Sequence, residues 1–105
     1  MTAEDFRRIA LSMPEAEERE HMKHPDFRVG KKIFATLGYP NAEWGMVKLT
    51  PEQQDNYVRA EPEVFKPCNG AWGRKGCTNV QLGKAKKTMV RRALTEAWRN
   101  LCPTP

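Results

Sequence analysis

Residues 44–53 are Trp44-Gly45-Met46-Val47-Lys48-Leu49-Thr50-Pro51-Glu52-Gln53, and they join a strand directly to a helix. Thr50 can cap the helix with its hydroxyl, Pro51 suits the first helical position, and Gln53 can complete a capping box. No other stretch of the chain carries so strong a local signal. It predicts a strand over residues 44–49 and a helix from Pro51 to about Glu61, before Pro62.

The residues before this stretch predict one helix and a set of short strands. Thr2 can cap a helix that runs from about Ala3 to Met13 and is stopped by Pro14. Between Glu18 and Leu37, apolar and polar residues alternate on both sides of Gly30, which predicts two or three short antiparallel strands.

The residues after the second helix predict two more strands and a final helix. Residues 64–67 favour a short extended segment, and the alternation of Thr78, Val80 and Leu82 favours a last strand. From about Ala85 to Leu101, apolar residues recur along one face of a helix. The predicted order, α-β-β-β-α-β-β-α, indicates an α+β fold with two layers, in which helices cover one face of an antiparallel sheet.

The length and composition indicate one domain over residues 1–105, with 39% hydrophobic and 30% charged residues. No stretch approaches the roughly 18 apolar residues that would span a bilayer, and the N-terminus shows no secretory signal. Because three cysteines (Cys68, Cys77 and Cys102) cannot all pair, we expect a reduced, cytoplasmic setting. The oligomeric state is left open by the sequence.

No motif for catalysis or for cofactor binding is present in the chain. His21 and His24 are three residues apart, and on one strand that spacing would place the imidazoles on opposite faces, so we expect no metal site. We therefore predict no catalytic residue, no cofactor and no enzyme activity. An enzyme hypothesis would require a pocket that joins these histidines to Cys68 or Cys77.

The positive charge is concentrated in the C-terminal part of the chain. Residues 1–63 hold nine Lys/Arg and twelve Asp/Glu, whereas residues 64–105 hold nine Lys/Arg and one acid, Glu96. A field of this kind attracts polyanions, so nucleic acid is the first partner class to consider.

Three segments are candidates for phosphate contacts. The Gly-rich residues 70–76 predict a hairpin tip that presents Trp72, Arg74 and Lys75; alternatively, Trp72 anchors the tip to the core and the two cations only solubilise it. Arg28, Lys31 and Lys32 flank Gly30 at a second tip. The final helix is predicted to open with Lys86 and Lys87, with Lys84 just before them. Cations at a helix start oppose the helix dipole, and a bound phosphate would offset that unfavourable interaction.

Several motifs together resemble the MmcQ/YjbR family of small bacterial proteins. The resemblance is carried by His24-Pro25-Asp26-Phe27-Arg28-Val29, Lys31-Lys32-Ile33-Phe34-Ala35-Thr36-Leu37, residues 44–54, Gly70-Ala71-Trp72-Gly73-Arg74 and Ala97-Trp98-Arg99. It implies a compact α+β domain similar to type III secretion chaperones and frataxin-like proteins, and DNA binding through a proposed double-wing surface. The basic positions that match the family are Arg28, Lys32, Lys48 and Arg74, whereas Lys84, Lys86 and Lys87 are more basic than its pattern.

We therefore predict a DNA-binding protein, with double-stranded DNA as the partner and weak sequence specificity, because the last helix must bury its apolar stripe. The alternative is a chaperone-like module that binds a protein or peptide. A continuous positive surface that joins Arg28, Lys32, Arg74 and Lys86 would favour DNA. An exposed apolar patch on the open face of the sheet would favour a protein partner.

Overall fold

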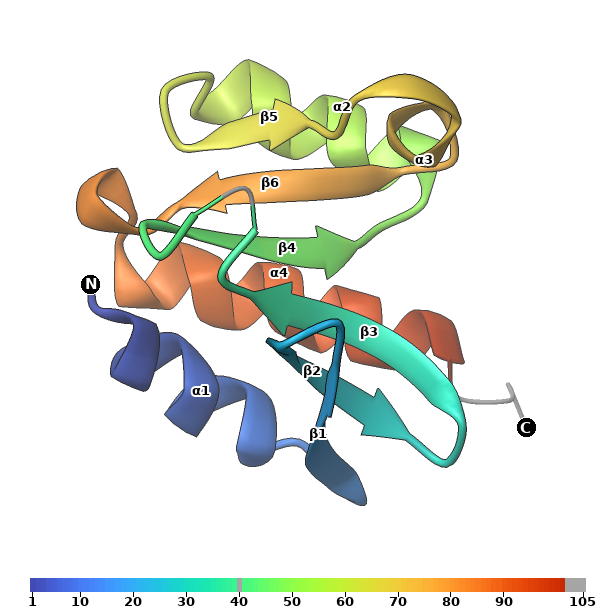
Figure 1. The fold of residues 1–105 in the computed structure, drawn as a ribbon. Helices are drawn as coiled ribbons and strands as arrows, with labels where there is room; N and C mark the ends of the chain where they lie inside the picture. Colours follow the sequence, from blue (N-terminus) through green and yellow to red (C-terminus); the bar gives the residue numbers. More distant parts are fainter. Residues whose placement is uncertain (40, 102–105) are drawn as a thin grey trace.

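Six antiparallel strands form one sheet in a computed structural model that describes residues 1–39 and 41–101 (Figure 1). The strands lie in the order β1-β2-β3-β4-β6-β5. In chain order the elements are α1 (Ala3–Leu11), β1 (Ala16–His21), β2 (His24–Val29), β3 (Lys32–Leu37), β4 (Trp44–Lys48), α2 (Pro51–Ala60), β5 (Phe65–Pro67), α3 (Gly70–Arg74), β6 (Cys77–Gln81), the 3-10 turn η1 (Leu82–Lys84) and α4 (Lys87–Leu101).

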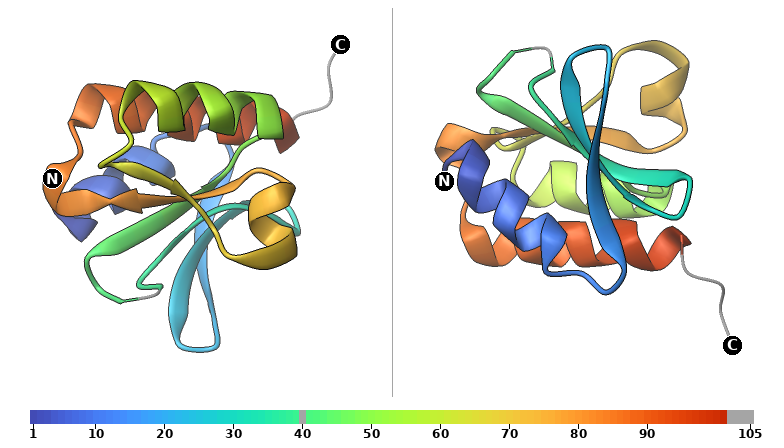
Figure 2. Two further views of the ribbon diagram at one scale, coloured as in Figure 1. Left: turned by 90° about the horizontal axis from the view of Figure 1, so that it is seen from above. Right: turned by 60° about the horizontal axis from the view of Figure 1, so that its bottom comes forward.

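The helices α1, α2 and α4 cover one face of the sheet, as the sequence predicts (Figure 2). The core between these layers is built from side chains that are fully buried. The largest of them include Phe6 of α1, Phe27 and Phe34 of the sheet, Phe65 of β5 and Leu94 of α4. The predicted α+β fold with a two-layer arrangement is therefore confirmed.

Both predicted helix caps are present. The Thr50 hydroxyl accepts a hydrogen bond from the Gln53 backbone N–H at 3.1 Å, and the Gln53 side chain accepts one from the Thr50 N–H at 2.9 Å. Thr2 and Asp5 form the same reciprocal pair at the start of α1. These caps explain why α2 and the N-terminus of α1 begin where the sequence predicts.

Three details differ from the predicted order. Four strands precede α2 instead of three, because residues 16–37 form three strands and residues 44–48 add a fourth. The final helix starts at Lys87 and not at Ala85, because Ala85 follows η1 with an extended backbone, at a φ of −84° and a ψ of 145°. The predicted hairpin tip at residues 70–76 is a helix, α3, followed by a tight turn.

Candidate nucleic-acid interface

Close backbone packing at two glycines holds α3 in place. A Cβ atom on Gly73 would lie 1.8 Å from the carbonyl oxygen of Cys68. A Cβ atom on Gly76 would lie 1.9 Å from the carbonyl oxygen of Leu49, and Gly76 has a φ of +111°, which side chains rarely adopt. Only glycine therefore lets the chain pass so close to β5 and to the end of β4. This tertiary packing explains why a glycine-rich segment forms a helix.

A side chain from α2 ties α3 to the sheet. The Gln54 amide nitrogen donates hydrogen bonds to the carbonyl oxygens of Gly73 at 3.0 Å and Cys77 at 2.9 Å. These two carbonyls flank the end of α3 and the start of β6. The base of α3 is therefore fixed by both packing and hydrogen bonds, and Gln54 is a site residue that the sequence analysis missed.

Trp72 projects from this fixed base with 63% of its surface exposed. It is therefore not an anchor in the core. The Lys48 ammonium lies 5.7 Å from the centre of the indole ring, and the Lys75 ammonium lies 5.8 Å from it. Ammonium groups at this range are attracted to the ring face. We call these three residues the tryptophan–lysine cluster.

A shallow hollow of about 330 Å³ adjoins the cluster. Its walls are largely apolar and come from the end of β4, the start of α2, α3 and the end of α4. The lining residues are Lys48, Leu49, Thr50, Pro51, Trp72, Lys75, Cys77, Asn100 and Leu101. Apart from Lys48, Trp72 and Lys75, none of these residues was predicted from the sequence to contact DNA, because the four segments meet only through the fold.

The second predicted basic tip lies at the same end of the sheet. Lys31 and Lys32 follow Gly30, which turns with a φ of +64° between β2 and β3. Lys32 begins β3, Lys48 ends β4, and Lys75 lies just before β6; these strands are antiparallel neighbours in that order. Figure 1 shows the β2–β3 turn and α3 on one side of the molecule. The structure therefore gathers two of the predicted segments.

We define the basic end as Lys31, Lys32, Lys48, Trp72, Arg74 and Lys75. Both Arg74 and Lys75 are exposed at the end of α3. In the part of the chain that the structure describes, none of the five cations forms an ion pair with an acid. Their charge is therefore available to an anionic ligand.

Arg28 has a different environment from the other candidates. Its guanidinium donates two hydrogen bonds to the Asp26 carboxylate, at 2.8 and 2.7 Å, and Asp26 is completely buried. His21 Nδ1 lies 2.8 Å from the same carboxylate. The Arg28 hydrogen bonds, supported by His21, hold the pKa of Asp26 below its usual value. We call Asp26, Arg28 and His21 the aspartate cluster; its arginine already has a partner.

The two histidines lie on one face of the sheet, contrary to the sequence prediction. His21 ends β1 and His24 begins β2, and they are direct partners across the two-residue turn between these strands. Cross-strand partners point to the same side, whereas the prediction assumed a single strand. Within residues 1–39 and 41–101, no group of three or more potential metal ligands is found.

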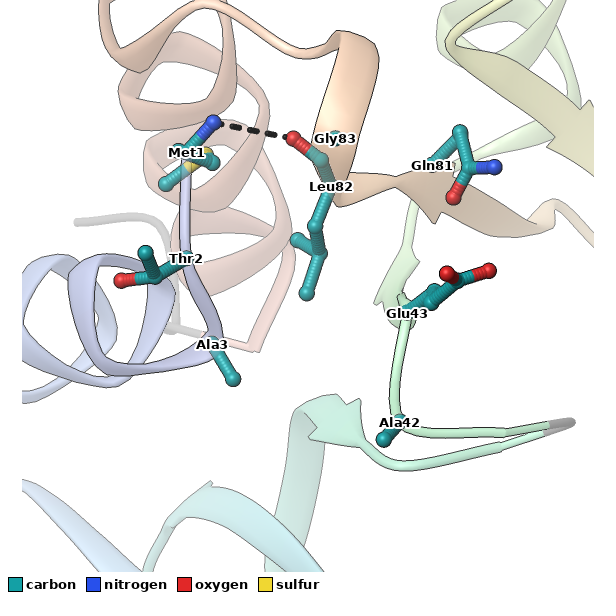
Figure 3. Close-up of a pocket in the computed structure, with 8 residues that line it drawn as sticks. All are labelled: Met1, Thr2, Ala3, Ala42, Glu43, Gln81, Leu82 and Gly83. Carbon is teal, nitrogen blue, oxygen red and sulfur yellow. Dashed lines mark hydrogen bonds between the residues drawn. The ribbon is translucent and has the colours of Figure 1, made fainter.

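Lys84, Lys86 and Lys87 lie at the opposite end of β6 from α3. The Lys87 ammonium is 3.6 Å from the Asp5 carboxylate, so an acid already offsets part of its charge. A second hollow of about 230 Å³ adjoins this end (Figure 3). Its lining includes Glu43 but no lysine or arginine. Arg74 and Lys86 therefore do not lie side by side, because the length of β6 separates them.

The cysteines and histidines are also kept apart. Cys68 and Cys77 lie on the β5–β6 side of the sheet, whereas His21 and His24 lie on the β1–β2 side, at the other edge. Burial, together with the neighbouring Cys77, raises the pKa of the Cys68 thiol to about 11. Cys102 lies outside the described residues. The pocket that an enzyme hypothesis requires is not formed by these four groups.

The exposed large apolar side chains of the described residues lie on four separate elements. Leu11 is on α1, Met22 is in the β1–β2 turn, Tyr39 follows β3, and Trp72 is on α3. The open face carries half-buried side chains such as Thr36, Met46 and Asn79, which lie in one cross-strand row. None of the exposed large apolar residues lies on that row, so the apolar patch expected for a protein partner is not found there. Within residues 1–39 and 41–101, no helix is both long and apolar enough to cross a membrane.

Comparisons with known proteins identify one family and one fold. The sequence model of a family described as YjbR matches residues 11–100. The structure is similar to the crystal structure of Deinococcus radiodurans protein DR2400, which carries a domain described as DUF419. The TM-score is 0.75 at 19% identity, and the match covers 91% of this chain and 75% of that chain. No match was found among curated proteins.

Proposed function

The chain belongs to the YjbR family, and on that premise we propose that it binds DNA through the basic end. The observation that carries the proposal is an exposed indole with the Lys48 and Lys75 ammonium groups 5.7 and 5.8 Å from its centre. Lys31, Lys32 and Arg74 belong to the same end of the sheet, and none of these five cations has an acid partner among the described residues. Such a surface attracts phosphates and can approach a nucleic-acid backbone closely.

The fold favours phosphate contacts over sequence reading. The helix α4 buries Val90, Ala93, Leu94 and Ala97 in the core, so only its opposite face is left for a ligand. The helix α3 has five residues and presents one indole and two cations at its end. We therefore propose weak sequence specificity, with affinity supplied mainly by Lys31, Lys32, Lys48, Arg74 and Lys75.

The salt dependence of binding tests this proposal. If the five cations each neutralise a phosphate, the logarithm of affinity falls with the logarithm of salt concentration at a slope of roughly −4 to −5. The experiment is fluorescence anisotropy of a labelled random 25-mer duplex, titrated at several salt concentrations. We expect micromolar or tighter binding at low salt. An absence of binding at low salt, both to the duplex and to its separated strands, would rule the proposal out.

The alternative function is recognition of a protein or peptide. It is favoured by Met22 and Tyr39, which are 85% and 64% exposed near the β1–β2 turn, away from the basic end. Tyrosine is enriched among the residues that carry most of the binding energy at protein interfaces. If the duplex does not bind, Met22 and Tyr39 are the residues to substitute in a search for a protein partner.

We propose that the protein works in the cytoplasm. Cys68 and Cys77 are free thiols in the structure, and unpaired cysteines are typical of a reducing compartment. Determining the thiol content of the protein isolated from its native cells would test this placement.

A further inference from the structure

We infer that the hollow beside Trp72 receives one unpaired nucleobase, so that the site prefers a strand with exposed base faces over an intact duplex. This inference rests on the proposed DNA binding and specifies the form of DNA that the basic end takes. The indole is 63% exposed and borders a hollow of about 330 Å³. A hollow of this volume has room for a planar base that stacks on the indole.

The positive charges beside the hollow can bind the phosphate groups of a nucleotide whose base lies in the hollow. The Lys48 and Lys75 ammonium groups lie over the indole ring, 5.7 and 5.8 Å from its centre. A base that stacks on the indole displaces them from the ring, and their flexible side chains can then reach the phosphates on either side of the base. Leu49, Pro51 and Leu101 supply apolar contacts for the base itself. A flat aromatic group that carries negative charge at its edges is the ligand that fits this combination.

The polar groups of the hollow are already engaged within the protein. The Thr50 hydroxyl accepts a hydrogen bond from the Gln53 N–H, and the Asn100 amide nitrogen donates to the carbonyl oxygen of Lys48 and to Gln53 Oε1. Few groups are therefore left to read the edge of a base. We expect the base to be held by stacking, which all four bases provide, and sequence preference to be weak.

The stacking surface is rigidly supported. The backbone of α3 is fixed at Gly73 and Gly76 by contacts that exclude even a methyl group, and Gln54 holds the carbonyls at its base. A fixed platform loses little conformational freedom when a ligand binds. In an intact duplex the base faces are covered by their neighbours, and a base must first be unstacked to reach the indole. Single strands avoid that cost.

The experiment compares three labelled probes of 12 residues at one salt concentration: a mixed-sequence single strand, a duplex of the same sequence, and a strand of abasic residues with the same phosphates. We expect the single strand to bind about ten-fold more tightly than both the abasic strand and the duplex, and a duplex that binds as tightly as the single strand would overturn the stated preference. Trp72→Ala should weaken the single strand about ten-fold, to the level of the abasic strand, and leave the abasic strand unchanged. Trp72→Phe should retain part of the preference.

The matched control is Tyr39→Ala, which removes another exposed aromatic ring at a distance from the basic end. It should not change the binding of any probe, and the circular dichroism spectrum and thermal unfolding of each variant show that it is folded. Equal affinity for the normal and abasic strands overturns the inference while the proposed DNA binding stands. Failure of all three probes to bind at low salt overturns both.

Discussion

The aspartate cluster and the tryptophan–lysine cluster both contain basic side chains, but these side chains have opposite environments. In the first, Arg28 meets a fully buried carboxylate with two hydrogen bonds, and His21 adds a third contact. In the second, Lys48 and Lys75 surround an exposed indole, and neither forms an ion pair among the described residues. The first cluster stabilises the sheet internally, whereas the second leaves its charge for a ligand.

A count of cations therefore does not locate a binding site. Arg28 is one of the basic positions that match the family resemblance, yet its charge is already engaged. Lys87 is also close to an acid. A cation contributes to a ligand site only where the fold gives it no internal partner, because an ion pair within the protein must first be broken before a phosphate can replace the acid.

The largest expected effect is the loss of the platform that carries the tryptophan–lysine cluster. Gly76→Ala places a Cβ atom 1.9 Å from the Leu49 carbonyl oxygen at a φ of +111°. Backbone strain and overpacking together should lower the free energy of unfolding by about 4 kcal/mol. Urea unfolding monitored by circular dichroism measures this change. Gly83→Ala is the matched control, since nothing lies within 4 Å of its added Cβ; an equal loss in both variants would contradict the packing argument.

The next largest effect concerns the aspartate cluster. Asp26→Asn keeps the shape of the side chain but leaves the Arg28 guanidinium without its charged partner. Breaking a buried pair in this way should lower the free energy of unfolding by about 3 kcal/mol. Lys48→Ala should change it by no more than about 0.5 kcal/mol, because that lysine has no such partner. Urea unfolding of the two variants at pH 7 compares the clusters directly, and similar losses would remove the distinction between them.

The same carboxylate predicts how stability depends on pH. Arg28 lowers the pKa of Asp26 in the folded protein, so the unfolded chain takes up a proton at a higher pH than the folded chain does. The stabilisation is therefore present above about pH 4 and is lost as the pH falls through the lower, folded pKa. Unfolding curves between pH 5 and pH 2 should show a smaller loss of stability for Asp26→Asn than for the wild-type protein.

Local signals in the sequence located most of the fold, and non-local packing set the rest. Thr2 and Thr50 cap helices through residues three positions away, so their effect is visible in the sequence. The helix α3 was missed because its glycines favour a turn locally, and only the contacts with Cys68, Leu49 and Gln54 make it helical. Trp72, Arg74 and Lys75 were identified as candidates, but their separation from Lys86 depends on the direction of β6.

A smaller effect is expected from the cations at the two ends of β6. Replacing Lys48 and Lys75 by alanine should weaken duplex binding about ten-fold and make the salt slope shallower by about 2. Replacing Lys84 and Lys86 removes the same charge at the opposite end and should reduce affinity less than about three-fold. Anisotropy titrations of both double variants at several salt concentrations measure these changes. Equal effects would mean that the net charge of the protein, and not the basic end, controls binding.

The smallest expected effect separates the two partners of Asp26. His21→Ala removes one hydrogen bond from a side chain that is 49% exposed, while Arg28 still donates two to the same carboxylate. The free energy of unfolding should fall by about 0.5–1 kcal/mol, and DNA affinity should stay the same, since the histidine is not part of the basic end. Urea unfolding and anisotropy on one preparation give both values. If His21→Ala lowers the free energy of unfolding as much as Asp26→Asn does, the histidine and not the arginine is the main partner of the buried carboxylate. In that case Arg28 is available for DNA.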